Sequence, residues 1–408
     1  MSEINRLLEE IEEIEKKASG IYIYGIGMYG RTAYKILSQN GIEIKGFVMT
    51  NPNKNELYTL PIINAEQAKK INAGIVLGLN IHNKNEVMEH LKNIHYDGDM
   101  VVDGTQAFLK ESETRGGFDE KVPTIEVTTV IGCKVGCRFC PQKLLTGNYF
   151  KENPDRERIM TIDTYQKCLD HIPKKCNILF CGMAEPFLNP NCIDMLKMTV
   201  ASGRKVDLYT TLVGLDKNRM EELLSVPVGW VTLHVADSMG YAKIPLTDDY
   251  YDMVKILLES KKKDGTPYIN LCNAQTTPDS GILELCKGKY EILTDMNDRA
   301  EQLEDRRLVS SSRRQEKIAC GYSGTTLNRN VLLPDGTLIL CMQDYGMRHV
   351  IGNLLEESFE EIMRGEQIEL VRKALMEPYS DVLCRSCSYA VVYGEAGEDE
   401  LNDTGKNQ

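Results

Sequence analysis

The sequence lacks both a long hydrophobic run and an excess of positive charge. None of its apolar stretches approaches the roughly 20 residues needed to cross a bilayer, and the segment Ser2–Lys17 is rich in glutamate where a secretory signal peptide would be basic and then apolar. Lys and Arg total 48 against 60 Asp and Glu, which gives a net charge of -12. We therefore expect a cytoplasmic protein with neither a membrane nor nucleic acid among its partners.

The composition also excludes a single small module and a wholly disordered chain. Hydrophobic residues make up 42% of the 408 residues and charged residues 26%, an ordinary globular balance. A chain of this length holds roughly two to four domains. Its 13 cysteines are too sparse for a disulfide-stapled secreted scaffold, and a reducing compartment would keep them as thiols. Seven of them are grouped in a way that suggests metal binding.

Residues 1–110 are predicted to form a Rossmann-like domain. The pattern indicates an amphipathic helix over 4–16, then a strand over 21–24, the turn Gly25-Ile26-Gly27-Met28-Tyr29-Gly30, a helix, and a second strand over 44–49. Apolar runs at 74–79 and 100–102 complete a small doubly wound sheet. The polar stretch 110–121 is typical of a linker.

The rest of the chain is predicted to be a partial (β/α)6 TIM barrel over 121–312, a small α+β domain over 313–393, and an acidic tail over 394–408. The barrel prediction rests on short apolar strands near 124–131, 177–181, 205–211, 230–235, 268–274 and 290–294, separated by helical segments. The α+β domain combines a hairpin, which turns through Pro334-Asp335-Gly336, with a helix over 356–376. The fold class is therefore α/β. In such barrels the reactive groups lie on loops after the strands.

Three cysteines, Cys133, Cys137 and Cys140, directly follow the first barrel strand. Three thiolates in one loop can bind three irons of a cubane cluster and leave the fourth iron without a protein ligand. An open iron of this kind can bind a substrate or a cofactor. The alternatives are a structural zinc site completed by a distant residue, or cysteines that simply pack in the core.

The CxxxCxxC spacing, with the aromatic Phe139 before the last cysteine, resembles the signature of radical S-adenosylmethionine (radical SAM) enzymes. The resemblance covers about residues 122–393. It implies a [4Fe-4S] cluster whose free iron binds S-adenosylmethionine, and reductive cleavage to a 5′-deoxyadenosyl radical that abstracts hydrogen from a C–H bond. It also implies a flavodoxin- or ferredoxin-type electron donor.

A second match to this family follows the second barrel strand, where Gly182-Met183-Ala184-Glu185 occupies the place of the family's Gly-Gly-Glu type of turn. Ala184 replaces a glycine, which puts the local backbone geometry in question because alanine disfavours positive φ. The resemblance implies cofactor contacts from this turn and from the ends of the neighbouring strands. The expected set is Phe139, Gly182, Met183, Ala184, Glu185, Thr210, Thr211 and His234.

Four further cysteines, Cys320, Cys341, Cys384 and Cys387, gather in the last quarter of the chain. Four thiolates close a tetrahedral zinc site or fully ligate a cubane, and chemistry alone does not separate these two. Their surroundings resemble a shortened form of the SPASM/twitch extension of radical SAM enzymes. The resemblance implies a single auxiliary [4Fe-4S] cluster with four protein ligands and a role in electron transfer.

The ligand of the first domain stays open on sequence grounds. The glycine-rich turn presents backbone N–H groups to a phosphate, but the second strand ends in Met49-Thr50-Asn51 without the acidic residue that NAD binding favours. A nucleotide-linked sugar, a carrier, or a purely structural role are the alternatives.

The resemblance to twitch-type radical SAM enzymes, with a Rossmann-like unit at the start of the chain, implies a small-molecule substrate. The reaction that it implies is hydrogen abstraction from a carbinol C–H of a sugar, cyclitol or nucleotide-linked sugar. Either dehydrogenation or epimerisation can follow. Epimerisation needs a cysteine that returns a hydrogen atom, and Cys181 and Cys272, at strands two and five, are the candidate donors. The alternatives are a ribosomal-peptide maturase that makes thioether or C–C crosslinks or epimerises residues, and a zinc-binding scaffold.

Overall fold

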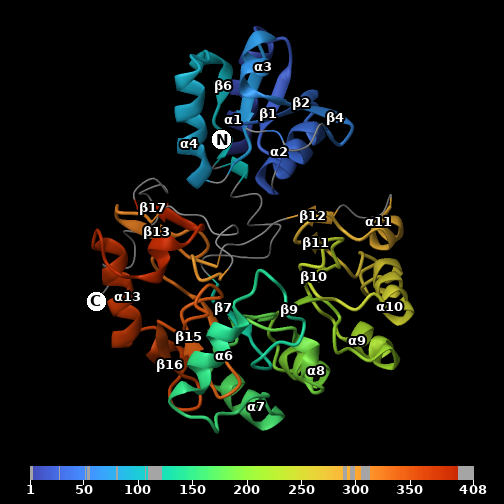
Figure 1. Ribbon diagram of the computed structural model, residues 1–408, viewed down its shortest axis with the longest axis vertical. Helices are drawn as coiled ribbons and strands as arrows, with labels where there is room; N and C mark the ends of the chain where they lie inside the picture. Colours follow the sequence, from blue (N-terminus) through green and yellow to red (C-terminus); the bar gives the residue numbers. More distant parts are fainter. Residues whose placement is uncertain are drawn as a thin grey trace. The chain divides into compact units, whose positions relative to one another are not determined.

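The computed structural model describes residues 3–26, 28–50, 52, 56–79, 81–105, 107–108, 122–287, 292–294, 299–304 and 313–393. The chain forms two compact units, Met1–Phe118 and Asp119–Gln408 (Figure 1). The predicted linker over 110–121 and the predicted acidic tail over 394–408 lie outside the described residues, as does Gly27 of the glycine-rich turn. Within the described ranges, no helix is both long and apolar enough to cross a membrane.

The first unit is a sheet of strands in the order β3-β4-β2-β1-β5-β6, with every described pairing parallel except β3 with β4. After β1, the chain first adds β2 and β4 on one side of it and then β5 and β6 on the other side, as in doubly wound folds. The pair β3 and β4 was not predicted. The elements are α1 (Glu3–Glu15), β1 (Ile21–Tyr24), α2 (Met28–Gln39), β2 (Ile44–Met49), β3 (Glu56–Leu57), β4 (Leu60–Asn64), α3 (Ala65–Lys70), β5 (Gly74–Leu77), α4 (Ile81–Asn93), the 3-10 turn η1 (Gly98–Met100) and β6 (Val101–Val102).

Local sequence explains why this unit packs as it does. Leu7, Ile11 and Ile14 recur at helical spacing in α1 and are all buried in the core of the unit. Gly30 is required at the start of α2 because a Cβ there would lie 2.1 Å from the carbonyl oxygen of Gly25. The glycine pair therefore allows strand β1 and helix α2 to approach each other closely.

The second unit contains a nine-stranded sheet in the order β12-β11-β10-β9-β8-β7-β14-β15-β16. The six strands from β7 to β12 are mutually parallel in sequence order, which confirms the predicted partial barrel. They are β7 (Thr124–Val127), β8 (Asn177–Phe180), β9 (Val206–Thr210), β10 (Val231–His234), β11 (Leu271–Ala274) and β12 (Ile292–Thr294).

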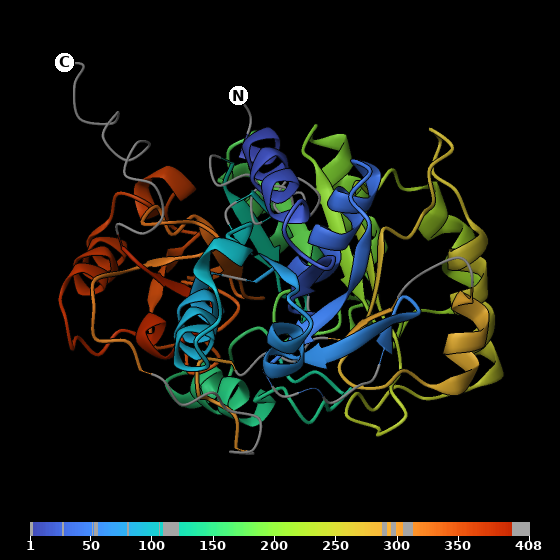
Figure 2. The ribbon, with the colours of Figure 1, turned by 90° about the horizontal axis from the view of Figure 1, so that it is seen from above.

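The C-terminal strands extend this sheet beyond β7, the first strand of the barrel. Strand β14 (Arg329–Leu332) pairs parallel with β7, and the predicted hairpin continues through β15 (Thr337–Ile339) to β16 (Val350–Asn353). A separate antiparallel pair joins β13 (Ile318–Cys320) to β17 (Ala390–Val392). The C-terminal elements therefore lie at one end of the unit and α11 at the other, as Figure 2 shows.

Helices cover the outer side of the barrel strands (Figure 1). The predicted helix over 356–376 is two helices, and the second begins after Gly365, its N-cap. The helices are α6 (Gln142–Lys151), α7 (Ile162–Asp170), α8 (Cys192–Ala201), α9 (Met220–Ser225), α10 (Asp248–Glu259), α11 (Ser280–Cys286), α12 (Phe359–Ile362) and α13 (Glu366–Met376), with 3-10 turns η2 (Pro186–Leu188), η3 (Lys217–Arg219) and η5 (Leu383–Ser386).

Candidate iron–sulfur sites

The loop after β7 holds the three thiols of Cys133, Cys137 and Cys140 close together. Backbone N–H groups point at the sulfurs, and the Glu185 N–H lies 3.5 Å from the Cys133 sulfur. Burial, together with the nearby Cys140 and Cys133 thiols, raises the pKa of Cys137 to about 12. Gly136 adopts a φ of 61° between the first two cysteines, so the loop can turn back on itself there.

Gln142 joins this loop to the turn after β8. Its side-chain oxygen accepts the Cys133 N–H at 3.1 Å, while its amide nitrogen lies 3.3 Å from the Cys140 sulfur and donates to the Met183 carbonyl. The Cys140 sulfur is also 3.3 Å from the Tyr345 hydroxyl, which comes from the C-terminal domain. Neither Gln142 nor Tyr345 was singled out from the sequence, because their roles depend on contacts across the fold.

The arrangement fits a cubane with one open iron. Among the residues that the structure describes, no three His, Cys, Asp or Glu side chains are placed to hold a single metal ion. A cubane makes a different demand, since each thiolate binds its own iron. Three thiols in one loop, ordered by backbone N–H groups, match that ligand set. Cys133, Cys137 and Cys140 would hold the cluster.

The turn after β8 has a positive φ only where the sequence has glycine, so Ala184 in place of the family's glycine causes no backbone strain. The positive φ of 49° belongs to Gly182, where a Cβ would lie 2.2 Å from the Thr128 hydroxyl. Ala184 is not among the described residues with positive φ. The Met183 N–H donates to the Thr128 hydroxyl at 2.9 Å, which fixes the turn against β7.

Glu185 brings the turn after β8 together with the end of β9. One of its carboxylate oxygens accepts from the Thr210 hydroxyl at 2.7 Å, and the other accepts from the Thr211 N–H at 2.6 Å and the Thr211 hydroxyl at 2.7 Å. The side chain is buried, and burial raises its pKa while these hydrogen bonds lower it. Glu185, Thr210 and Thr211 therefore form one connected group, whereas Phe139 packs in the main core.

His234 faces the barrel interior as a neutral imidazole. Burial lowers its pKa to about 4. Its Nδ1 lies 3.3 Å from the Asn273 side-chain oxygen, and its ring is edge-on to Tyr209, with centroids 6.1 Å apart. Donation from Nδ1 to Asn273 leaves Nε2 as an acceptor.

The two candidate donor cysteines lie on different faces of the barrel strands. The Cys181 thiol lies 3.3 Å from an oxygen of Glu126, whose other oxygen is paired with Arg329 at 2.7 Å. Cys272 is instead hydrogen-bonded to Cys286 of α11, so it faces the helix layer. Side chains alternate along a strand, and Asn273, the next residue, is the one that reaches His234. The structure therefore corrects the inward placement of Cys272 and brings only Cys181 to the interior ion pair.

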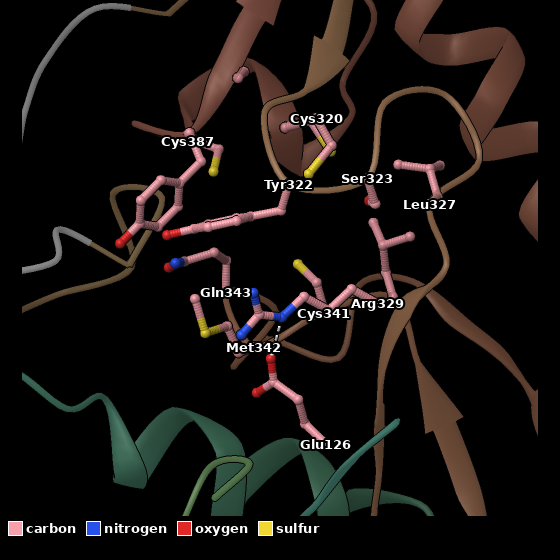
Figure 3. Close-up of a pocket in the computed structure, with 14 residues that line it drawn as sticks. Glu126, Cys320, Tyr322, Ser323, Leu327, Arg329, Cys341, Met342, Gln343 and Cys387 are labelled. Carbon is pink, nitrogen blue, oxygen red and sulfur yellow. Dashed lines mark hydrogen bonds and ion pairs between the residues drawn. The ribbon is translucent and has the colours of Figure 1, made fainter. Parts of the chain in front are cut away.

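The four C-terminal cysteines line one cavity (Figure 3). Cys320 ends β13, Cys341 follows β15, and η5 with the residue after it supplies Cys384 and Cys387. Burial raises the pKa values of Cys341 and Cys384, and neighbouring cysteines of the same group raise them further. The remaining lining residues are Glu126, Tyr322, Ser323, Leu327, Arg329, Leu340, Met342, Gln343, Tyr389 and Ala390.

Gln343 supplies an independent sign that this cavity holds a group that accepts hydrogen bonds. The residue is 3% exposed, and neither atom of its side-chain amide has a hydrogen-bond partner among the described residues. Buried amides are normally paired, because an unpaired one carries a desolvation cost of about 1–3 kcal/mol. Four thiols around a cavity that contains such an amide fit an auxiliary cubane with four protein ligands.

Arg385 holds the last two cysteines in place. It lies between Cys384 and Cys387 and has no exposed surface. Its guanidinium donates to carbonyl oxygens at the end of α13, including those of Ala374 and Leu375, and to the Glu316 carbonyl. This cation therefore ties the cysteine pair to both α13 and the segment before β13.

The sequence reasoning missed the pair Glu126 and Arg329. Glu126 is fully buried in β7, between the interior thiol of Cys181 and the C-terminal cavity. A charged residue between the apolar Ile125 and Val127 of a strand was the available signal, since buried carboxylates are rare unless paired.

Family comparisons agree with the two cysteine groups. A model described as the radical SAM superfamily matches residues 127–263, and the SPASM model, described as an iron–sulfur cluster-binding domain, matches residues 320–388. The first segment contains Cys133, Cys137 and Cys140, and the second contains the four C-terminal cysteines.

Curated relatives are distant. A probable dual-specificity RNA methyltransferase RlmN from Acaryochloris marina is 25% identical over 212 residues, which cover 49% of this chain and 54% of the relative. RlmN from Wigglesworthia glossinidia brevipalpis is 24% identical over 239 residues, with 53% and 58% covered. The chain thus spans a little more than half the length of these relatives.

Solved structures also show low similarity. BtrN in complex with AdoMet and 2-DOIA is 17% identical, with a TM-score of 0.39 over 63% of this chain and 88% of that one. Streptococcus suis SuiB bound to its precursor peptide SuiA is 13% identical, with a TM-score of 0.41 over 70% and 77%.

Proposed function

This chain belongs to the radical SAM superfamily and carries an iron–sulfur cluster-binding domain of the SPASM type, and from that premise we propose that it abstracts hydrogen from a carbinol C–H bond of a sugar, cyclitol or nucleotide-linked sugar. Its cofactors are S-adenosylmethionine, the [4Fe-4S] cluster that binds it, and auxiliary iron–sulfur chemistry in the SPASM domain. When bound, these groups supply a 5′-deoxyadenosyl radical and a route for single electrons.

The observation that carries this proposal is the buried chain of polar side chains from Cys181 through Glu126 to Arg329. It begins beside the turn after β8 and ends in the wall of the four-cysteine cavity. His234 and Asn273 add further hydrogen-bonding groups on the barrel interior. Such a set suits a small polyhydroxylated substrate, because a hydroxyl group both donates and accepts hydrogen bonds.

We propose epimerisation, with Cys181 as the hydrogen donor. The Cys181 S–H bond breaks and its hydrogen atom goes to the substrate carbon, on the face opposite to that of abstraction. Restoring the thiol then takes one electron, which an auxiliary cluster would supply when bound and reduced, and one proton from the surroundings of the sulfur; the Glu126 carboxylate, which accepts a hydrogen bond from the Cys181 thiol at 3.3 Å, orients that thiol. In the alternative outcome, dehydrogenation, the substrate instead loses a proton and an electron and leaves as a ketone.

Turnover in deuterated water separates these outcomes. Epimerisation by Cys181 predicts a redox-neutral product that carries one deuterium on carbon, because thiol hydrogens exchange with solvent. Substitution C181A should abolish this incorporation while substrate-dependent formation of 5′-deoxyadenosine continues. The matched control is C272A, which removes a thiol on the helix-facing side and should retain deuterium uptake. An oxidised product without deuterium would rule out epimerisation, and turnover of peptides but not of carbinols would rule out the substrate class.

A further inference from the structure

The three cysteines of the loop after β7 meet different kinds of hydrogen-bonding group. Backbone N–H groups contact the sulfurs of Cys133 and Cys137, the latter from Lys243 in the loop after β10. The Cys140 sulfur is instead contacted by side chains, and the Tyr345 hydroxyl lies 3.3 Å from it. A donor on a side chain depends on the amino acid at that position, so this contact is a property of the sequence and not of the backbone alone.

The Tyr345 hydroxyl is directed at the Cys140 sulfur inside the protein core. Tyr345 is 2% exposed and packs in a buried cluster that includes Ile131 and Met183. A buried tyrosine hydroxyl normally keeps a hydrogen-bond partner, and here that partner is the sulfur. A cysteine thiolate bound to iron carries no proton and can only accept, so the Tyr345 O–H must then be the donor.

The loop that carries Tyr345 is fixed at both ends. Asp344, which has no exposed surface, accepts the two backbone N–H groups of residues 348–349, each at 2.8 Å. On the other side, the side chain of Gln302 accepts the Gly346 N–H at 2.7 Å. These bonds hold the backbone next to Tyr345, so its hydroxyl is placed beside the sulfur before any cluster binds.

The same loop carries one of the C-terminal cysteines. Cys341 lines the four-cysteine cavity (Figure 3) and lies four positions before Tyr345. The Gln343 carbonyl accepts the Tyr345 N–H at 3.0 Å, which makes a tight turn between the two positions. One short segment of the C-terminal domain therefore contacts both groups of cysteines.

We propose that Tyr345 is a positioning residue of the catalytic site, whose hydroxyl donates to the Cys140 thiolate and raises the reduction potential of the cluster that this thiolate binds. Hydrogen bonds to cluster sulfurs stabilise the more negative, reduced form. A bond to an ionised acceptor in a buried site is also stronger than one between neutral groups. The C-terminal domain thus acts on the catalytic cluster through this side chain. The inference does not depend on the carbinol substrate.

The test is an anaerobic redox titration of the holoenzyme followed by EPR. The signal of the catalytic cluster is identified by its change when S-adenosylmethionine binds to the open iron. Y345F removes the hydroxyl alone, and we expect a tenfold shift of the one-electron equilibrium, about 59 mV towards lower potential. The control Y149F removes a hydroxyl from a tyrosine that lies in the same buried cluster but donates to the Glu157 carbonyl at 2.6 Å, and it should keep the wild-type potential.

A second measurement detects the proton of the hydrogen bond. ENDOR spectra of the reduced catalytic cluster, recorded before and after exchange into deuterated water, should show one exchangeable-proton coupling in the wild type and in Y149F that is missing in Y345F. An unchanged potential in Y345F, an equal shift in Y149F, or a Y345F spectrum equal to that of the wild type would each overturn the proposal.

A modified tyrosine covers the case in which Y345F retains too little iron and sulfide for titration. The fluorine of 3-fluorotyrosine, incorporated at position 345, makes the hydroxyl a stronger donor, so the potential should rise above that of the wild type. An unchanged or lower potential would contradict the role of Tyr345. Since each measurement precedes turnover, failure of this proposal leaves the proposed carbinol chemistry unaffected.

Discussion

Glu126 of β7 and Arg329 of β14 form an ion pair of 2.7 Å although they are 203 positions apart in the chain. Both side chains are buried, and Figure 3 shows the pair at the edge of the four-cysteine cavity. The barrel and the C-terminal domain are thus joined by a buried ion pair next to the Cys181 thiol.

Removing one partner of this pair should destabilise the second unit. We expect R329M to lower the free energy of unfolding by about 3–5 kcal/mol, because it leaves Glu126 buried without its counterion. The double variant E126Q/R329M should recover part of that loss, since no uncompensated charge remains. Anaerobic thermal unfolding of the cluster-loaded protein measures both. Equal losses in the single and double variants would contradict the coupling.

The turn after β8 should tolerate a change at Ala184 but not at Gly182. Substitution G182A places a Cβ 2.2 Å from the Thr128 hydroxyl at a φ that alanine disfavours, so we expect at least about tenfold weaker binding of S-adenosylmethionine. The matched variant A184G should bind within about twofold of the wild type, because Ala184 has no positive φ to relieve. Calorimetric titration of the cluster-loaded protein measures both affinities. Weak binding of S-adenosylmethionine by A184G would contradict the assignment of the special backbone geometry of this turn to Gly182.

His234 should make stability depend on pH. Its pKa is lowered to about 4 in the fold, below its ordinary value of about 6.5, so the unfolded chain binds a proton that the folded chain does not. The resulting stability is complete above pH 6.5 and falls as the pH decreases towards 4, at a slope that approaches about 1.4 kcal/mol per pH unit. Unfolding measured between pH 5.5 and 7.5 should show this slope in the wild type and a flatter profile in H234N. Parallel profiles would exclude a buried neutral His234.

The unpaired amide of Gln343 should act on the reduction potential of the auxiliary cluster. Hydrogen bonds to cluster sulfurs stabilise the more negative, reduced form, so Q343L should lower the potential. We expect a shift of roughly 60 mV, equivalent to a tenfold change in a one-electron equilibrium. Anaerobic redox titration followed by EPR measures it. The control M342L changes a neighbouring cavity residue without a polar group and should leave the potential unchanged.

Much of the fold could be predicted because periodicity and turn residues are local. Six apolar runs identified the strands from β7 to β12, and Pro334-Asp335-Gly336 marked the hairpin that became β14 and β15. The pairing of β14 with β7 was not predictable in the same way. It joins residues about 200 positions apart, and no local pattern records which strand edge a hairpin will meet.

The candidate sites were also predictable only where they depend on local sequence. Metal ligands were identifiable from sequence because coordination demands particular residue types at short spacing, as in Cys133, Cys137 and Cys140. The orientation of a single cysteine was not. Cys181 and Cys272 look alike in sequence, yet one is bonded to Glu126 and the other to Cys286, because strand register decides which face a side chain takes.

The sequence by itself determined the class of chemistry of this protein, since two groups of cysteines and a glycine turn are enough to identify the cofactors. Only the tertiary structure decided which side chains lie around the two cysteine groups. The contacts of Glu126 with Arg329 and Cys181, the enclosure of Gln343, and the Lys243 loop over Cys137 each join distant segments. Such contacts arise when separate elements pack into one core, and this packing depends on the whole chain at once.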